Sequence, residues 1–309
     1  MHTINSDSAE ETMWKISVCN DALLPGMPFF ERSLALLSGL GIEYIEPRLI
    51  DNKHILNMSN DEIHELKKTL KKYNMKVGGL GTPVFKCPLR GYDEPEWAKG
   101  KTHGYEKGNH KGDGAYEDHL KLLERAFEIS DMLDALSIRC FSFWREYAMD
   151  EVFDEVVEKI QKGVRMARSS GHILAIENDS SQMAGTGVEM ARIIRAVGEG
   201  LTGIYDFGNS WHGGGIVYPD DFEALKGGLL SHIHIKHESM ENETTGERTI
   251  VPITVKRNYY HPDFLNALHK DGYKGLIGVD SIFPASNAEE SIKTAIGDLK
   301  KFIKEMEEQ

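Results

Sequence analysis

Residues 172–209 read HILAIENDSSQMAGTGVEMARIIRAVGEGLTGIYDFGN, and this stretch contains the pattern that decides the fold. Short apolar runs at His172–Ile176 and Thr202–Tyr205 are typical of buried strands. Between them, apolar residues recur at helical spacing over Val188–Val197, which predicts an amphipathic helix. Because parallel strands need a crossover connection, strand, helix and strand in this order predict a parallel βαβ unit.

The same alternation continues outward to both ends of the chain. Six more strands are predicted at residues 14–19, 43–46, 75–80, 136–141, 231–236 and 276–279. Seven more helices are predicted at residues 29–40, 60–73, 117–133, 150–169, 221–225, 262–271 and 288–307. Strict alternation of eight strands and eight helices favours an α/β fold, the closed (β/α)₈ TIM barrel. An open doubly wound sheet is the alternative, and the absence of GxGxxG after the first strand weighs against it.

The chain shows no linker, so residues 14–309 are predicted to form a single barrel domain with long βα loops. Residues 1–13 are polar and acidic, and we expect a flexible tail there. Residues 84–114 carry two prolines and six glycines, which indicates a long loop. Such loops are usually functional, so this one is either a lid over the site or a contact between subunits. A second polar insertion is expected at residues 237–258.

Composition restricts the partners of the protein. The sequence has 36 Lys+Arg against 49 Asp+Glu, a formal charge of −13, and such a surface repels nucleic acid. The three cysteines are far apart and form no CxxC, which fits a reducing compartment. With no apolar signal segment and no membrane-length apolar run, the expectation is a cytoplasmic protein without a membrane partner. Barrels with long loops often pair, so a homo-oligomer stays an open expectation.

Candidate site residues lie where four consecutive strands end, the edge at which barrel active sites form. Glu177 ends the fifth strand, Asp206 the sixth and Asp280 the eighth, while His234 lies in the seventh. Strand parity lets these side chains point into the barrel together. Three buried carboxylates would repel one another unless a cation lay among them. Three carboxylates and an imidazole suit one divalent metal ion, Mn²⁺, Mg²⁺, Co²⁺ or Zn²⁺.

Four ordered motifs carry a resemblance to a known family. These are Glu177-Asn178-Asp179 with Gly185-Thr186-Gly187, the D-x-G-N of 206–209, the H-x-H-x-K of 232–236, and the GYxG of 272–275. With them the chain resembles the xylose isomerase-like TIM-barrel superfamily, specifically its sugar phosphate isomerase/epimerase group. The resemblance covers nearly the whole chain, but the motifs are specific for the superfamily and do not identify the substrate.

The resemblance implies roles for individual residues. Glu177, Asp206 and His234 fall on the metal-ligand positions of the family. The fourth position is usually Glu, and here it is Asp280, which is one methylene shorter. Glu177 and Asp280 correspond to the two carboxylates that exchange a proton with the substrate. Five further residues are candidate substrate contacts: Asn209, His212, Lys236, and, at the ends of earlier strands, Arg145 and Glu46. For Lys236 the alternative is a salt bridge to Asp206.

The implied activity is a metal-dependent isomerase or epimerase of a sugar, keto-sugar or sugar phosphate, a small-molecule carbohydrate. It would remove a proton next to a carbonyl and pass through an enediolate. The alternatives are an inosose-type dehydratase, since the same intermediate can expel a hydroxyl, and a non-catalytic sugar-binding barrel. An endonuclease of the same superfamily is disfavoured, because its three-metal cluster needs inward histidines on earlier strands and the charge here is −13.

Overall fold

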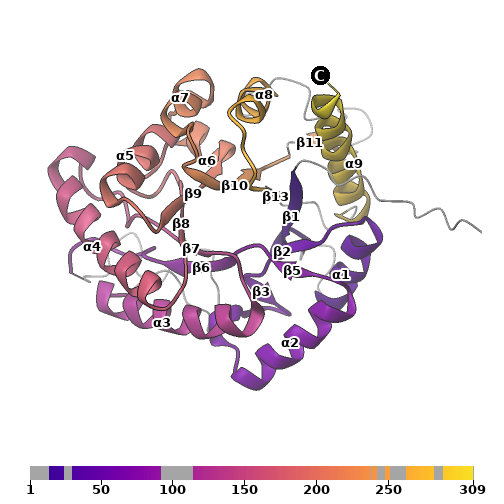
Figure 1. The fold of residues 1–309 in the computed structure, drawn as a ribbon, viewed down its shortest axis with the longest axis horizontal. Coiled ribbons are helices and arrows are strands. Elements are labelled where there is room, and N and C mark those ends of the chain that lie inside the picture. Colours follow the sequence, from indigo (N-terminus) through magenta and orange to yellow (C-terminus); the bar gives the residue numbers. More distant parts are fainter. Residues whose placement is uncertain are drawn as a thin grey trace, which may run out of the picture.

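The computed structural model describes residues 14–23, 30–91, 114–237, 262–281 and 288–308, and the backbone of β11 (Ser239–Glu241) and β12 (Arg248–Ile250). The predicted tail, most of the predicted loop at 84–114 and most of the insertion at 237–258 lie outside these residues. Within them the chain forms a nearly closed parallel barrel with helices around it, as Figure 1 shows. The predicted fold class is therefore confirmed.

The barrel strands follow one another around the sheet in chain order. Each neighbouring pair is parallel, and the last strand, β13, pairs with the first, β1. The strands are β1 (Lys15–Cys19), β2 (Tyr44–Glu46), β5 (Lys76–Val77), β6 (Leu80–Val84), β7 (Ile138–Cys140), β8 (Leu174–Glu177), β9 (Leu201–Asp206), β10 (Leu230–Ile235) and β13 (Leu276–Val279). Two antiparallel pairs lie outside the barrel: β3 (Leu49–Ile50) with β4 (Lys53–His54), and β11 with β12.

The third strand of the barrel differs from the prediction at 75–80. It consists of two segments, β5 and β6, separated by Gly78 and Gly79 and extending to Val84. Gly78 N–H donates to Ile45 O (2.9 Å) on one side, and Leu80 N–H donates to Ser137 O (2.9 Å) on the other. The glycines thus let one stretch of chain pair first with β2 and then with β7. Because glycines are uncommon inside strands, the sequence pattern predicted an end at residue 80 rather than at residue 84.

The helices surround the barrel (Figure 1). Their buried apolar side chains belong to the hydrophobic core. The second of these helices begins with a capping box, in which Ser59 Oγ accepts from Glu62 N–H and Glu62 accepts from Ser59 N–H. A short helix directly after β9, α6, was not predicted. The helices are α1 (Phe30–Gly39), α2 (Asn60–Lys72), α3 (Tyr116–Leu133), α4 (Met149–Ser169), α5 (Gly187–Val197), α6 (Phe207–His212), α7 (Phe222–Leu225), α8 (Pro262–Lys270) and α9 (Ala288–Glu307).

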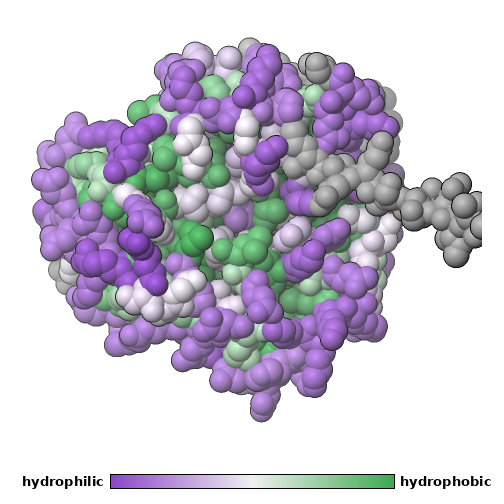
Figure 2. Space-filling model, in the orientation of Figure 1, coloured by the Kyte–Doolittle hydropathy of each residue, from purple (hydrophilic) through white to green (hydrophobic). Residues whose placement is uncertain are grey.

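The apolar core fills the layer between strands and helices. Buried side chains such as Leu34 and Leu37 of α1 and Ile292 and Leu299 of α9 pack onto it. Figure 2 shows hydrophilic side chains over the outer helices, with apolar side chains gathered around the centre of the same face. Among the described residues, no helix has the length and apolar character needed to cross a membrane.

Candidate active site

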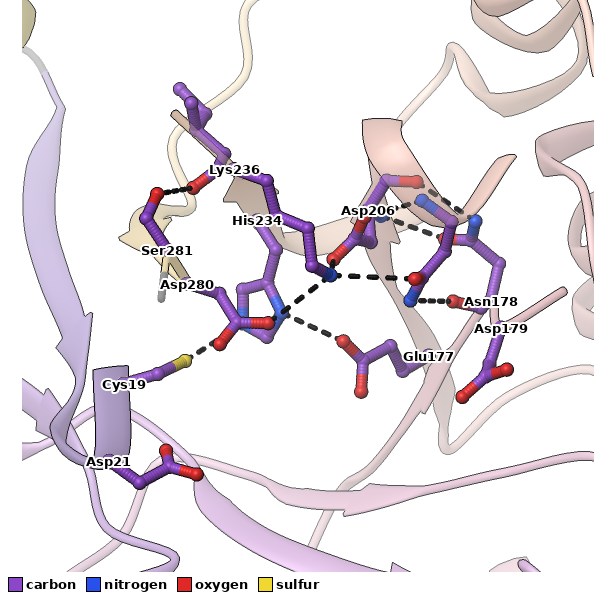
Figure 3. A network of polar contacts seen from close by, with 12 residues as sticks. Cys19, Asp21, Glu177, Asn178, Asp179, Asp206, His234, Lys236, Asp280 and Ser281 are labelled. Carbon is purple, nitrogen blue, oxygen red and sulfur yellow. Dashed lines mark hydrogen bonds and ion pairs between the residues drawn. The ribbon is translucent and has the colours of Figure 1, made fainter. Parts of the chain in front are cut away.

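Four side chains from four neighbouring strands meet inside the barrel. Glu177 ends β8, Asp206 ends β9, His234 lies in β10 and Asp280 directly follows β13. One ligand atom from each lies within 4.8 Å of the others. Glu177, Asp206 and His234 are buried, and Asp280 is partly exposed. Figure 3 shows these side chains converging, with Lys236 reaching between them. The structure thus brings together the four residues that the sequence predicts as metal ligands.

Asn178 fixes the relative position of the ends of β8 and β9. Its side chain accepts from Asp206 N–H (2.8 Å) and donates to Asp206 O (3.0 Å). Asp206 also caps α6, because its Oδ1 accepts from Asn209 N–H (2.7 Å). These bonds satisfy the backbone where the strands end, so the Glu177 and Asp206 carboxylates have defined positions.

Glu177 is held between Arg139 and His234. Its Oε2 accepts from Arg139 of β7 (2.9 Å), and its Oε1 lies 2.9 Å from His234 Nδ1. Burial raises the pKa of Glu177, but the charge of Arg139 and the hydrogen bond from His234 outweigh burial and lower it to about 2. The Glu177 carboxylate is therefore ionised at neutral pH.

Asp206 and Asp280 share the ammonium group of Lys236. Lys236 Nζ contacts Asp206 Oδ2 and lies 3.4 Å from Asp280 Oδ2. Burial raises the pKa of Asp206 against the opposing charge of Lys236, and nearby Glu177 and Asp280 raise it further. This is the repulsion among buried carboxylates that the sequence predicts. For Asp280, burial is outweighed by Lys236 and His234, so its pKa lies below its ordinary value.

Glu46 approaches His234 from the side opposite the cluster. Its Oε2 lies 2.8 Å from His234 Nε2, and its Oε1 accepts from Ser17 Oγ (2.5 Å). Burial alone would lower the pKa of His234, but Cys19, Glu46 and Glu177 raise it well above the ordinary value. Cys19 Sγ is farther from Nε2, at 3.8 Å, and burial raises the pKa of this thiol to about 12.

The structure brings some of the predicted substrate contacts to the cluster of candidate metal ligands and leaves others away from it. Lys236 reaches the cluster and makes the alternative salt bridge to Asp206. Asn209 lies beside it but is engaged, since its amide donates to Asn178 O (2.9 Å). His212 ends α6 on the surface. Arg145 is bonded to Gln182 O, Met183 O and Glu189, so the structure does not bring it to the cluster. Glu46 reaches the cluster through His234.

Arg139 and Ser17 were missed by the sequence reasoning. Arg139 is buried in β7 and bonds Glu177, and Ser17 is buried in β1 and bonds Glu46. A signal for Arg139 was present, because an arginine in the middle of an apolar predicted strand needs a buried anionic partner. Ser17 offered no comparable signal.

The donor set fits a divalent cation. Three carboxylates and one imidazole lie close enough to share an ion, and Glu177 and Asp280 are ionised at neutral pH. The carboxylates of this site face the cationic side chains of Arg139 and Lys236, and Arg48 lies close enough to lower the pKa of Asp280.

The family model described as "Xylose isomerase-like TIM barrel" matches residues 34–302. No curated protein sequence matches the chain. Among solved structures, a probable 3-DHS dehydratase, AsbF, from Bacillus anthracis is 15% identical over 93% of this chain and 98% of its own, with TM-score 0.64. The IolI protein with a binding zinc atom is 15% identical over 94% and 99%, with TM-score 0.69. D-psicose 3-epimerase in the presence of D-fructose is 16% identical over 94% and 99%, with TM-score 0.63.

Proposed function

Because this chain belongs to the xylose isomerase-like TIM-barrel family, we propose that it is a divalent-metal-dependent isomerase or epimerase of a sugar or keto-sugar. The observation that carries the proposal is the buried convergence of Glu177, Asp206, His234 and Asp280. The solved structure of IolI holds a zinc atom, and D-psicose 3-epimerase was crystallised with a ketose, which supports the same chemistry here.

The reaction needs a base beside the carbon that loses its proton and an acid beside the carbon that regains it. A divalent cation held by the four residues would polarise the substrate carbonyl and stabilise the negative charge of the enediolate. Glu177 and Asp280 come from strands on either side of Asp206 and His234 and are ionised at neutral pH. Each can therefore accept a proton. In an isomerisation the group that accepted the proton returns it to the neighbouring carbon, and in an epimerisation the other carboxylate, in its protonated form, donates a proton on the opposite face.

Lys236 and Arg139 keep these carboxylates ionised. Arg139 bonds Glu177 Oε2, so only Oε1 of Glu177 is turned toward His234 and the cluster. Lys236 lies against Asp206 and Asp280 and can donate a hydrogen bond to a substrate oxygen once a cation takes over these carboxylates. The site thus combines two proton-accepting groups with one ammonium donor.

The test is hydrogen exchange in D₂O with Mn²⁺ and a panel of aldoses, ketoses and keto-inositols. The proposal expects deuterium at the carbon next to the carbonyl of one substrate, together with an isomer or epimer of it. The Glu177→Gln variant should lose this exchange, whereas Arg145→Gln, which changes a residue away from the cluster, should retain it. Absence of exchange with every substrate, in a protein that binds metal, would favour a non-catalytic sugar-binding barrel.

A dehydratase is the second candidate, and Asp280 is the observation that favours it. A carboxylate one methylene shorter than Glu reaches less far, and Asp280 is also held by Lys236. An epimerase needs proton transfer on both faces of the substrate, but a dehydratase needs one base and a donor to the departing hydroxyl. Loss of water from a substrate, with no epimer formed, would select this activity. The probable dehydratase AsbF has the same fold.

A further inference from the structure

Glu46 is placed to determine which nitrogen of His234 faces the candidate metal site. The Nδ1 atom of His234 points to Glu177 (2.9 Å) and the cluster, and the Nε2 atom points to Glu46 (2.8 Å). Each ring nitrogen faces a carboxylate, so the metal-free imidazole can carry a proton on both. A cation bound on the cluster side would displace the Nδ1 proton, whereas the Glu46 carboxylate would retain the proton on Nε2. The lone pair of Nδ1 is then directed at the cluster.

The contact between Glu46 and His234 is supported by two neighbouring strands. Ser17 of β1 donates to Glu46 Oε1 at 2.5 Å, which leaves Oε2 for His234. Gly278 of β13 lies against both partners. A Cβ atom at Gly278 would lie 2.7 Å from Glu46 Oε1 and 2.8 Å from His234 Cδ2. Residues from β1, β2, β10 and β13 therefore combine to form this one pair.

The contact between Glu46 and His234 is buried, which limits the acceptors available to the Nε2 proton. Glu46 is 4% exposed, and Ser17 and His234 are 0% exposed. Water does not compete for the Nε2 proton, so Glu46 is the strongest acceptor available to it. Cys19 Sγ is the other neighbour of Nε2, but it is farther away (3.8 Å), and its thiol is a weak acceptor.

We propose that Glu46 is a positioning residue that holds the proton of His234 on Nε2 and presents Nδ1 to a divalent cation. This role replaces the substrate contact predicted for Glu46 from the sequence. The inference rests on the proposed function, because it concerns the same metal site. Partners of this kind behind a ligating histidine typically change metal affinity by 10- to 100-fold when removed.

The experiment compares Zn²⁺ affinity and the protonation of His234 in full-length variants. Competition with a chromophoric chelator gives the Kd for Zn²⁺, and ¹⁵N NMR of labelled histidine reports which ring nitrogen carries the proton. Glu46→Ala should raise the Kd by roughly 10- to 100-fold and shift the Nε2–H resonance of His234 in the Zn²⁺-bound protein, because that proton loses its acceptor. Glu46→Gln should restore part of the affinity, because its carbonyl oxygen can accept the same proton while its amide faces Ser17. Gly278→Ala should act in the direction of Glu46→Ala.

Asp221→Asn is the matched control. Asp221 is also a buried carboxylate, but it accepts from Tyr205 and Ser210 on the outer side of β9 and α6. This variant should lower the melting temperature without changing the Kd or the His234 signals. Equal Kd values in wild type and Glu46→Ala would overturn the inference alone. A wild-type chain that binds no Zn²⁺ would overturn the proposed function as well.

Discussion

Lys236 is the residue whose charge competes most directly with a metal ion. Its ammonium group contacts Asp206 and lies 3.4 Å from Asp280, two of the candidate ligands. Lys236→Met removes this charge, so the carboxylates should attract a cation more strongly. We expect the Kd for Mn²⁺ to fall on the order of tenfold, measured by isothermal titration.

Lys86→Met serves as the control for that substitution. Lys86 is also partly buried and paired with a carboxylate, but its partner is Asp179 (2.8 Å), which is outside the cluster. The affinity of this variant should equal that of wild type. Weaker Mn²⁺ binding by Lys236→Met would show that Lys236 organises the ligands rather than competing with the ion.

His237 makes the stability of the fold dependent on pH. Burial lowers the pKa of His237 from its ordinary value of 6.5 to about 4. The unfolded chain therefore takes up a proton before the folded chain does, and stability present above pH 6.5 is lost as the pH falls toward 4. This loss amounts to at most about 3 kcal/mol. In His237→Gln, the free energy of unfolding should change less between pH 6.5 and 4, as urea titrations would show. Parallel curves for both proteins would contradict this assignment.

The residue patterns predicted which side chains form the site, but they did not predict all the contacts between them. Strand parity and strand ends sufficed to select Glu177, Asp206, His234 and Asp280, because adjacent parallel strands end at one edge. The contact of Glu46 with His234 could not be predicted in this way. The two residues are 188 positions apart and meet only because the barrel closes.

At the scale of elements, two glycines in helices test the packing of the outer layer, because one is packed against a side chain and the other faces open space. Gly163 of α4 faces Phe85, and a Cβ atom there would lie 2.5 Å from the ring. Gly297 of α9 is exposed, and a Cβ atom would meet nothing within 4 Å. Gly163→Ala should destabilise the protein by about 1–3 kcal/mol, and Gly297→Ala should stabilise it by about 0.5–1 kcal/mol. Chemical denaturation measures both, and the same sign for both would contradict this packing.

Most elements follow from local pattern, and the exceptions have physical reasons. The 3.6-residue periodicity located α2, which packs as an ordinary amphipathic helix. The predicted third barrel strand was too short at its C-terminal end. Glycine and proline usually end strands, and this stretch contains Gly78, Gly79, Gly81 and Pro83. The short α6 was missed because Asp206 both ends β9 and caps the helix, which leaves no loop between them.

At the scale of the whole molecule, barrel closure creates the site. β13 pairs with both β1 and β10, so Ser17, Gly278 and His234 become neighbours although they lie far apart in the chain. The strand count and the strict alternation predicted this closure. The sequence could not specify the substrate, because βα loops help to shape the pocket of a barrel enzyme and their conformation is not determined by strand or helix periodicity.

Metal binding to the full-length chain is the most direct test of a shared cation site. Isothermal titration of the chelator-treated protein with Mn²⁺ should give one ion per chain in the wild type. Asp206→Asn removes a buried ligand charge, and we expect it to weaken binding by at least roughly a hundredfold. Wild-type protein that binds no divalent ion, or an Asp206→Asn variant that binds as tightly as wild type, would contradict the proposal that these carboxylates and His234 hold a metal.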